Sequence, residues 1–312
     1  MANVTGQPDY RHPERFLGLD DDASAAETSA AWVLPLPLEL TTSFVGGTRL
    51  GPAAIIEASN QVELYDAEVG AEAAPRYGVH TLPALHAPLS PREAFEAISG
   101  AVAALPLAGR LLVTLGGEHS LTPAVIRGLA AHNLEHWPEL IMVQIDAHSD
   151  LREAYDGTPH SHACAARRAL DDVAHVIQLG IRSVCEEEVR FARDHADRVT
   201  IWTAESMRRD GERRYLDALR RAVAGRPVYL SIDVDGLDPS VIPATGTPEP
   251  GGIGWYDCLD IIRAVCQAGR LVAFDCVELC PAPGAHASAF AAAKLVYRTL
   301  NEAMLARGVL GA

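Results

Sequence analysis

The sequence has no surplus of positive charge and no long apolar run. Lys and Arg number 26 against 41 Asp and Glu, which gives a formal net charge of −15 at pH 7. Nucleic acid and anionic membrane surfaces are polyanions, so this balance argues against both as partners and weakly favours cationic substrates and metal ions. The sequence contains no run of about 18 apolar residues, the length that a membrane-spanning helix requires. We therefore expect neither nucleic acid nor a membrane among its partners.

Cysteine is sparse, with six residues in 312, and no pair has the spacing of a zinc finger. Cys276 and Cys280 stand four apart in an apolar stretch, which is typical of buried structural thiols. Scattered free thiols fit a reducing compartment. Residues 1–22 lack the basic and apolar segments of a secretory signal peptide. We therefore expect a cytoplasmic protein.

After residue 30, short apolar runs alternate with amphipathic segments. The runs are rich in Val, Ile and Leu with little period-2 alternation, which is typical of strands buried on both faces. Strands that alternate with helices favour a three-layer α/β fold, with a mainly parallel sheet and helices on both faces. The expected strands are 31–35, 110–115, 140–145, 175–180, 198–202, 228–233 and 271–277. The expected helices are 52–60, 91–104, 121–131, 186–196, 211–224, 255–267 and 287–306.

The chain reads as one domain preceded by an arm. Residues 1–30 are polar and rich in Asp, Pro and Ala, and we interpret them as an N-terminal arm. The stretch 236–254 is dense in Pro and Gly, as a linker would be, but it directly follows a strand that ends in carboxylates. We interpret it as a shaped active-site loop, and residues 31–312 as a single domain.

Polar side chains follow four of the expected strands at their carboxyl ends. In an open parallel sheet, ligands bind outside these ends of the strands. The side chains are therefore expected to meet at one rim of the sheet. The four sequences are GGEHS at 116–120, DAHSD at 146–150, DVDG at 233–236, and Glu278.

Within DAHSD, Asp146, His148 and Asp150 face the same way along an extended chain. Crowded carboxylates raise one another's pKa unless a cation lies among them. Asp233 and Asp235 repeat the pattern. One such motif alone is typical of a solvated loop or an Asx-turn. Two at strand ends, together with GGEHS, favour a metal site.

The candidate ligand set is large and rich in oxygen. Six ligands are too many for one tetrahedral zinc ion and suit two divalent ions that share carboxylates. Four carboxylates and two imidazoles favour Mn²⁺, with Ni²⁺, Co²⁺ and Fe²⁺ left open. Two such ions about 3.5–4 Å apart can bind a water between them and deprotonate it near neutral pH. The candidate ligands are His119, Asp146, His148, Asp150, Asp233 and Asp235.

Three long motifs resemble the signatures of the ureohydrolases, the family of arginase and agmatinase. They are GGEHS, DAHSD, and SIDVDGLDPS followed by PATGTPEPGG, and their order is the family's. The resemblance runs from about Trp32 to about Leu305. It implies an arginase-like fold, two Mn²⁺ ions per subunit, a homotrimer or homohexamer, and hydrolysis of a guanidinium group to urea and an amine.

The resemblance also implies how the ligands are shared. It gives one metal His119, Asp146, Asp150 and Asp233, and the other Asp146, His148, Asp233 and Asp235, with Asp146 and Asp233 bridging. Asp150 would in addition carry a proton from the attacking water to the leaving nitrogen.

Two further residues complete the predicted catalytic set of Asp150, His162 and Glu278. Glu278 stands where the family pairs a Glu with the substrate guanidinium, a planar group that matches a carboxylate bidentately. A Glu paired with a structural Arg is the alternative. His162 resembles the family's proton-shuttle His, since imidazole titrates near neutrality. His160 competes for this role, but the SHA and RR pattern around His162 resembles one agmatinase branch. Arg182 matches a family feature at the rim and is interpreted as structural.

The substrate's tail is less closely specified. Where arginases carry an Asn beyond DxHxD, this sequence has Arg152, and the TPEPGG run at 247–252 looks more like agmatinases. The prediction is therefore a small cationic guanidino substrate, with agmatine cleaved to putrescine and urea. A guanidino acid remains the main alternative because Arg152 could pair with a carboxylate, and arginase is a further one. A non-catalytic homologue predicts eroded ligands, whereas all six are present. A two-metal phosphoesterase is disfavoured because Glu278 would repel phosphate.

Overall fold

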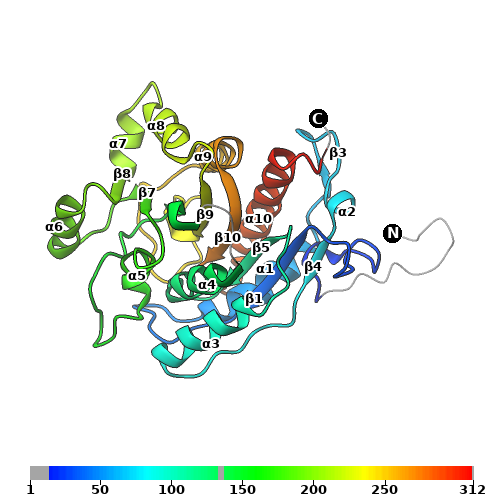
Figure 1. Ribbon diagram of the computed structural model, residues 1–312, viewed down its shortest axis with the longest axis horizontal. Helices are drawn as coiled ribbons and strands as arrows, with labels where there is room; N and C mark the ends of the chain where they lie inside the picture. Colours follow the sequence, from blue (N-terminus) through cyan, green and yellow to red (C-terminus); the bar gives the residue numbers. More distant parts are fainter. Residues whose placement is uncertain (1–13, 133–136, 311–312) are drawn as a thin grey trace.

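The computed structural model describes residues 14–132 and 137–310. Its middle layer is an eight-stranded sheet in the order β4-β1-β5-β10-β9-β6-β7-β8, and every pairing in it is parallel (Figure 1). A separate antiparallel pair consists of β2 (Tyr65–Asp66) and β3 (Ala71–Glu72). The strands of the large sheet are β1 (Ala31–Leu36), β4 (Val79–Thr81), β5 (Leu111–Gly116), β6 (Ile141–Ile145), β7 (His175–Ile181), β8 (Val199–Thr203), β9 (Pro227–Asp233) and β10 (Arg270–Val277).

Helices cover both faces of the sheet and enclose two hydrophobic cores. One core takes buried residues from α1 (Gly51–Ser59), α8 (Arg214–Val223), α9 (Trp255–Ala268) and α10 (His286–Ala306). The other takes them from α3 (Pro91–Ala103), α4 (Thr122–Leu129) and α5 (Ala165–Ala169). The remaining helices are α2 (Ala74–Tyr77), α6 (Glu186–Asp194) and α7 (Ala204–Arg209). The predicted three-layer α/β fold is confirmed.

Alternation along each strand explains why the strands are apolar throughout. In β5, Leu111, Val113 and Leu115 pack into the first core, whereas Leu112 packs into the second. Successive side chains of a strand point to opposite faces, so a strand covered on both sides needs apolar residues at nearly every position.

The seven expected strands and seven expected helices are all present, with ends within three residues of those predicted. The sequence analysis did not predict β4, the β2–β3 pair, α2, α5 or α7. Each of these is six residues or shorter. Such segments are too short to display a helical or strand period.

The described part of the predicted arm packs onto the body of the protein. Phe16, Leu17 and Leu19 are buried in the same core as α1 and α10. The backbone N–H of Phe16 donates to Thr81 Oγ1 at 2.9 Å, and that of Leu17 donates to Ser59 Oγ at 2.7 Å. Residues 14–30 therefore share the core of the domain, while residues 1–13 lie outside the described residues.

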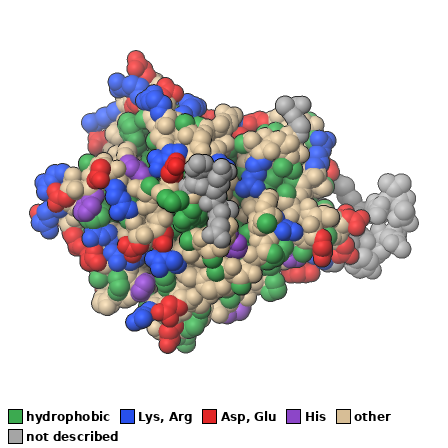
Figure 2. All heavy atoms as spheres, viewed as in Figure 1, with side chains coloured by type: hydrophobic (Ala, Val, Ile, Leu, Met, Phe, Trp, Pro, Cys, Tyr) green, Lys and Arg blue, Asp and Glu red, His purple; other side chains and the backbone are tan. Residues whose placement is uncertain are grey.

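The surface of the protein carries charges of both signs. Figure 2 shows Lys and Arg side chains interspersed with Asp and Glu over one face. Within the described residues, no helix combines the length and apolar character that a membrane span requires.

Strands β5, β10, β9 and β6 are consecutive neighbours at the centre of the sheet. The four sequences that the analysis singled out follow these strands, so the topology brings their side chains to one rim.

Candidate metal centre

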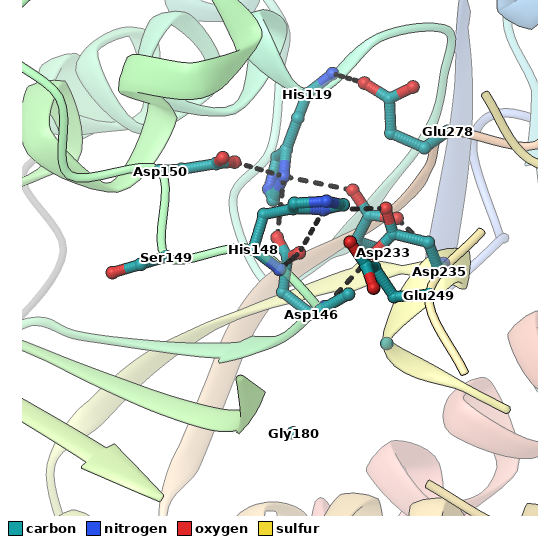
Figure 3. Close-up of polar contacts among 12 residues, drawn as sticks. His119, Asp146, His148, Ser149, Asp150, Gly180, Asp233, Asp235, Glu249 and Glu278 are labelled. Atoms are coloured by element: carbon teal, nitrogen blue, oxygen red, sulfur yellow. Dashed lines mark hydrogen bonds and ion pairs between the residues drawn. The ribbon is translucent and has the colours of Figure 1, made fainter. Parts of the chain in front are cut away.

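All six predicted metal ligands lie together at the carboxyl ends of β5, β6 and β9 (Figure 3). His119 begins a 3₁₀ turn after β5, and Asp233 ends β9. Five of the six are buried, and the His148 side chain is 27% exposed. All except Asp146 line a cavity of about 340 Å³, which Glu278 and His162 also line. The structure thus joins residues that are up to 159 positions apart in the sequence.

The imidazole of His119 faces three carboxylates. Its Nδ1 lies 3.1 Å from Asp146 Oδ2, 3.1 Å from Asp150 Oδ2 and 3.3 Å from Asp233 Oδ2. This buried nitrogen has no hydrogen-bond partner among the residues that the structure describes. Three oxygens and a nitrogen that converge on one point have the donor set and the placement that a divalent cation needs.

The second imidazole shares Asp146 with the first. Nδ1 of His148 lies 3.0 Å from Asp235 Oδ2 and 3.7 Å from Asp146 Oδ1, whereas Asp146 Oδ2 faces His119. The atoms of His119, Asp146 and Asp233, and those of Asp146, His148 and Asp235, form two groups compact enough to hold an ion each. One carboxylate with an oxygen in each group is the arrangement of a bridging ligand.

Electrostatics also indicate a cation. Burial, followed by repulsion from Asp150 and Asp235, raises the pKa of Asp146 to about 7. Burial and the charges of Asp235 and Asp146 likewise raise the pKa of Asp233 well above its ordinary value. Burial opposes charge on Asp235 as well, but its pairing with His148 lowers that pKa. Two imidazoles therefore cannot balance the buried carboxylates, and divalent cations fit the residues present.

The histidines themselves respond to the same field. Burial opposes a charge on His119, but the carboxylates of Asp146, Asp150 and Asp233 outweigh it and hold its pKa well above the usual value. Burial also opposes a charge on His148, but the carboxylate of Asp235 outweighs it and raises the pKa of His148 to about 10. Without a metal, protons occupy the places that cations would take.

A buried chain of hydrogen bonds fixes the ring of His119. Its Nε2 lies 2.8 Å from Ser231 Oγ, and this hydroxyl donates to Asp275 Oδ1 at 2.7 Å. The hydroxyl therefore accepts from Nε2–H, which leaves Nδ1 of the neutral ring bare toward the carboxylates. Thr122 Oγ1 and Tyr229 OH donate to the other oxygen of Asp275, each at 2.6 Å.

The sequence analysis missed Ser231 and Asp275, and it also missed Gln144, whose Nε2 donates to Asp146 Oδ2 at 2.6 Å. All three are fully buried polar residues inside strands that are otherwise mostly apolar. That contrast is the signal that could have found them, because a buried polar group must have a partner.

Glu278 adopts a strained backbone conformation at the end of β10. Its φ is 64°, and Asp150 has a φ of 53°. Such values in residues other than glycine cost about 1–3 kcal/mol and concentrate at functional sites. Glu278 N–H donates to the Gly117 carbonyl at 2.8 Å, and Glu278 Oε1 accepts from His119 N–H at 2.7 Å. Burial, followed by the charge of Glu118, raises the pKa of Glu278 well above its ordinary value.

Only glycine fits at position 117. A Cβ on Gly117 would lie 2.0 Å from the carbonyl oxygen of Leu38. This close approach lets the turn after β5 bring His119 and Glu278 into contact.

The two candidate shuttle histidines are placed differently. His162 lines the cavity, with Nδ1 at 3.3 Å from Thr41 Oγ1 and Nε2 at 3.2 Å from Ser43 Oγ. His160 instead packs its ring on Phe95, with the ring centres 4.9 Å apart. Burial and the nearby cations of Arg168 and Arg92 lower the pKa of His160. Of the two, His162 is the one that lines the cavity together with the candidate metal ligands.

Two arginines of the rim differ in what they contact. Arg182 Nη2 donates to the carbonyls of Asp235 at 2.6 Å and Glu249 at 2.8 Å, so it holds two loops together, in keeping with its structural interpretation. Arg152 lines the cavity with its guanidinium over the Tyr155 ring, 5.1 Å from the ring centre.

Known proteins resemble this chain over almost its whole length. Residues 29–301 match the sequence model of the arginase family. An N(1)-aminopropylagmatine ureohydrolase from Synechocystis is 34% identical over 93% of this chain and 94% of its own. One from Thermus thermophilus is 36% identical over 88% and 90% of the two chains, and an agmatinase from Bacillus anthracis is 32% identical over 82% and 85%.

Solved structures also resemble this chain over most of its length. The agmatine ureohydrolase of Thermoplasma volcanium has a TM-score of 0.81 and 29% identity, with 93% of this chain and 94% of that chain covered. The proclavaminate amidino hydrolase of Streptomyces clavuligerus has a TM-score of 0.83 and 27% identity, with 96% and 100% covered. The chain belongs to the arginase family and is a ureohydrolase, a hydrolase that acts on guanidino compounds.

Proposed function

We propose that the protein hydrolyses agmatine to putrescine and urea, with two Mn²⁺ ions held by His119, Asp146, His148, Asp150, Asp233 and Asp235. The observation that carries this proposal is the convergence of three carboxylates on Nδ1 of His119, with Glu278 hydrogen-bonded to the same residue in one cavity. A second candidate substrate is N1-aminopropylagmatine, because several relatives that match most of this chain are named N(1)-aminopropylagmatine ureohydrolase.

The proposed metal ligands serve to activate water. The other catalytic residues orient the substrate and transfer protons. When bound, the two cations supply a deprotonated water near neutral pH and stabilise negative charge that develops in the transition state. Everything else in the reaction depends on side chains that orient the guanidinium and move protons.

Glu278 orients the guanidinium group. A carboxylate can accept two parallel N–H bonds from a planar guanidinium, which fixes both the distance and the plane of the substrate. The His119 N–H bond to Oε1 at 2.7 Å and the strained φ of 64° hold this carboxylate in place before substrate arrives. Such preorganisation would hold the guanidinium carbon in one position for attack by water.

Two residues move protons in this scheme. Asp150, with Oδ2 3.1 Å from His119 Nδ1, faces the cavity and takes the proton of the attacking water to the leaving nitrogen. His162 exchanges protons between the cavity and solvent. Its backbone N–H donates to Thr41 Oγ1 at 3.0 Å, and Glu118 in turn accepts from that hydroxyl at 2.7 Å, so the histidine is held from a buried anchor.

The proposal extends to the ion, the compartment and the assembly. An oxygen-rich ligand set favours Mn²⁺, six free cysteines fit a reducing cytoplasm, and the family resemblance implies a homotrimer or homohexamer. Elemental analysis of protein purified without added metal tests the ion. Light scattering after size-exclusion chromatography tests the assembly, and a monomer would contradict it.

A comparison of substrates tests the activity itself. The Mn²⁺-loaded protein is assayed for urea release with agmatine, N1-aminopropylagmatine, arginine, guanidinobutyrate, guanidinopropionate and guanidine. We expect the cationic agmatine compounds to give the highest kcat/KM. Turnover of guanidinobutyrate alone would favour the guanidino-acid alternative, and the absence of urea from every compound would refute the proposal.

Glu278→Gln separates substrate binding from metal binding. The variant should retain two metal ions per subunit and lose urea release by about 100-fold or more, because a charge-assisted bidentate contact is replaced by a neutral one. Glu57→Gln, at an exposed position of α1, is the matched control and should keep full activity. Full activity of Glu278→Gln, or loss of its metal ions, would contradict the assigned role.

A further inference from the structure

The loop after β9 places one more carboxylate in the cavity. Glu249 lines the cavity together with Gly246 and Thr247, and its residue is only partly buried. Asp235 lines the same cavity, and Figure 3 shows both residues in the view of the acidic cluster. It lies between Pro248 and Pro250, whose fixed φ angles restrict the backbone on both sides.

Hydrogen bonds fix the backbone of this loop. Arg182 donates to the Glu249 carbonyl from Nη2 at 2.8 Å and from Nε at 3.3 Å. Asp238 Oδ2 accepts from the N–H groups of Gly251 at 3.1 Å and Gly252 at 3.0 Å. A Cβ on Gly252 would lie 2.5 Å from Asp238 N, so the loop closes on itself at this point. The Glu249 side chain therefore projects from a rigid base.

The other carboxylates of the cavity are already committed. Asp150, Asp233 and Asp235 face the two imidazoles, and Glu278 is bonded to His119 N–H. Both oxygens of Glu188 accept backbone N–H groups, from Leu151 at 3.0 Å and from Cys185 at 2.8 Å. The Glu249 carboxylate, by contrast, has no hydrogen bond or ion pair within residues 14–132 and 137–310. A partly buried carboxylate that lines a cavity and has no protein partner is available to pair with a cationic group of a ligand.

Arg152 offers the opposite charge but is engaged. Its guanidinium lies over the Tyr155 ring, and this cation–π contact satisfies part of its charge. A substrate with an anionic tail would have to approach the unpaired Glu249 carboxylate, which repels it. A substrate with a cationic tail pairs with Glu249 and leaves Arg152 on Tyr155.

We infer that Glu249 binds the distal ammonium group of the substrate and thereby selects linear guanidino amines over guanidino acids. This inference rests on the proposed function, which it deepens. Arg182 Nη2 donates hydrogen bonds to the backbone carbonyls of both Asp235 and Glu249. The backbone of Glu249 therefore lies close to that of Asp235, which is a proposed metal ligand. Both side chains line the same cavity, so the inference applies to a substrate whose guanidinium and ammonium groups bind in that cavity together.

The test uses the Mn²⁺-loaded protein and Glu249→Gln. For agmatine, KM should rise about 10- to 100-fold with kcat changed less than about threefold, because tail binding contributes equally to ground and transition states. For butylguanidine, which has an uncharged tail, the kinetic constants should not change. Glu205→Gln, on an exposed side chain of α7, is the control. Glu249→Lys should shift the ratio of kcat/KM values toward guanidinobutyrate by at least about tenfold.

Binding of a product amine gives a readout independent of turnover. Calorimetry with 1,4-diaminobutane should detect binding to the wild-type protein and at least about tenfold weaker binding to Glu249→Gln, with Glu249→Asp in between. An unchanged KM for agmatine, or equal diamine binding, overturns the inference while the proposed function stands. Loss of a metal ion in Glu249→Gln also overturns it, because Glu249 would then be a ligand. A wild-type protein that releases no urea but binds the diamine through Glu249 refutes the proposed function and retains the cation site.

Discussion

Two clusters of acidic side chains within residues 14–132 and 137–310 differ in what opposes their charge. The first joins the β2–β3 hairpin to α9 and α10. Arg298 Nη1 donates to both oxygens of Asp66 at 2.7 Å. Arg263 and Arg298 reach Glu68 at 2.5 and 2.8 Å, and Glu302 at 3.2 and 3.3 Å. Here, three acids share two guanidinium groups that the chain itself supplies.

The pKa values show how the two clusters differ. Burial alone would raise the pKa of Asp66, but the Asn301 amide and the Arg298 guanidinium lower it below its ordinary value. At the metal centre, burial and like charges raise the pKa of Asp146 and Asp233. In the first cluster, burial and the neighbouring Glu68 raise the pKa of Glu302, but an arginine of the chain contacts every one of the three acids. The second is incomplete until cations arrive, and this deficit distinguishes a binding site from a structural ion network.

The largest effect is expected from Asp233→Asn. The substitution removes a charged ligand whose Oδ2 lies 3.3 Å from His119 Nδ1, so binding of two metal ions should be lost and urea release should fall about 1,000-fold or more. The metal-free variant should nevertheless be more stable than metal-free wild type at pH 8, because one repelling charge is gone.

Metal analysis, urea release and thermal melting in a chelator measure these three quantities for Asp233→Asn. Asp217→Asn, at an exposed position of α8, should match the wild type in all of them. Unchanged turnover of Asp233→Asn with two ions bound would remove the metal assignment.

Arg298→Gln applies the same logic to the first cluster with the opposite sign. The variant leaves buried Asp66 and Glu302 short of positive charge and should lower the free energy of unfolding by about 3–5 kcal/mol. Denaturant titration measures this loss, while the metal content should stay at two ions. Arg190→Gln, in an exposed pair with Glu186, should cost less than about 1 kcal/mol. If both variants were equally stable, Arg298 would not be the residue that holds the buried acids of this cluster.

The pH dependence of metal binding sharpens the comparison further. In the metal-free protein, the pKa of His148 is raised from 6.5 to about 10, so its stabilising contribution is present below pH 6.5 and is lost as pH rises toward 10. The lowered pKa of Asp66 has the reverse effect, since its contribution is present above the ordinary carboxyl pKa of 3.8 and is lost at lower pH.

Metal binding should therefore release protons from the site. Two protonated imidazoles must give up about two protons, so Mn²⁺ affinity should rise by up to about 100-fold per pH unit between pH 6 and 8. Calorimetry in buffers of different ionisation enthalpy counts the protons. A count of zero would mean that the histidines are neutral before the metal binds.

The sequence predicted the long helices and strands, because their composition depends mainly on which faces meet solvent and which meet a hydrophobic core. Strand β9 and helix α10 were recognisable because burial alone decides their composition. The three-residue edge strand β4 was not, because its place depends on pairing with β1. The order of strands was equally inaccessible, since β10 inserts between β5 and β9 through contacts that are distant in sequence.

The site divides in the same way. His119, Asp146 and Glu278 stand at strand ends, where the carboxyl-end rule places them without knowledge of the strand order. Ser231 and Asp275 are different, because they lie inside β9 and β10 and meet only because these strands pair with the two residues opposite each other. Their role was hidden until the register was known.

Ser231→Ala is the smallest effect that we expect and the most specific. The hydroxyl links His119 Nε2 to Asp275, so its loss should leave the ring free to change tautomer and should weaken Mn²⁺ binding by about 10- to 100-fold, with the fold intact. Competition with a chelator measures the affinity. Thr122→Val is the matched control, because it also removes a hydroxyl bonded to Asp275 but does not touch His119. If Ser231 orients the ligand, only Ser231→Ala weakens the metal. If the network serves stability alone, the two variants lose similar unfolding free energy and bind Mn²⁺ as the wild type does.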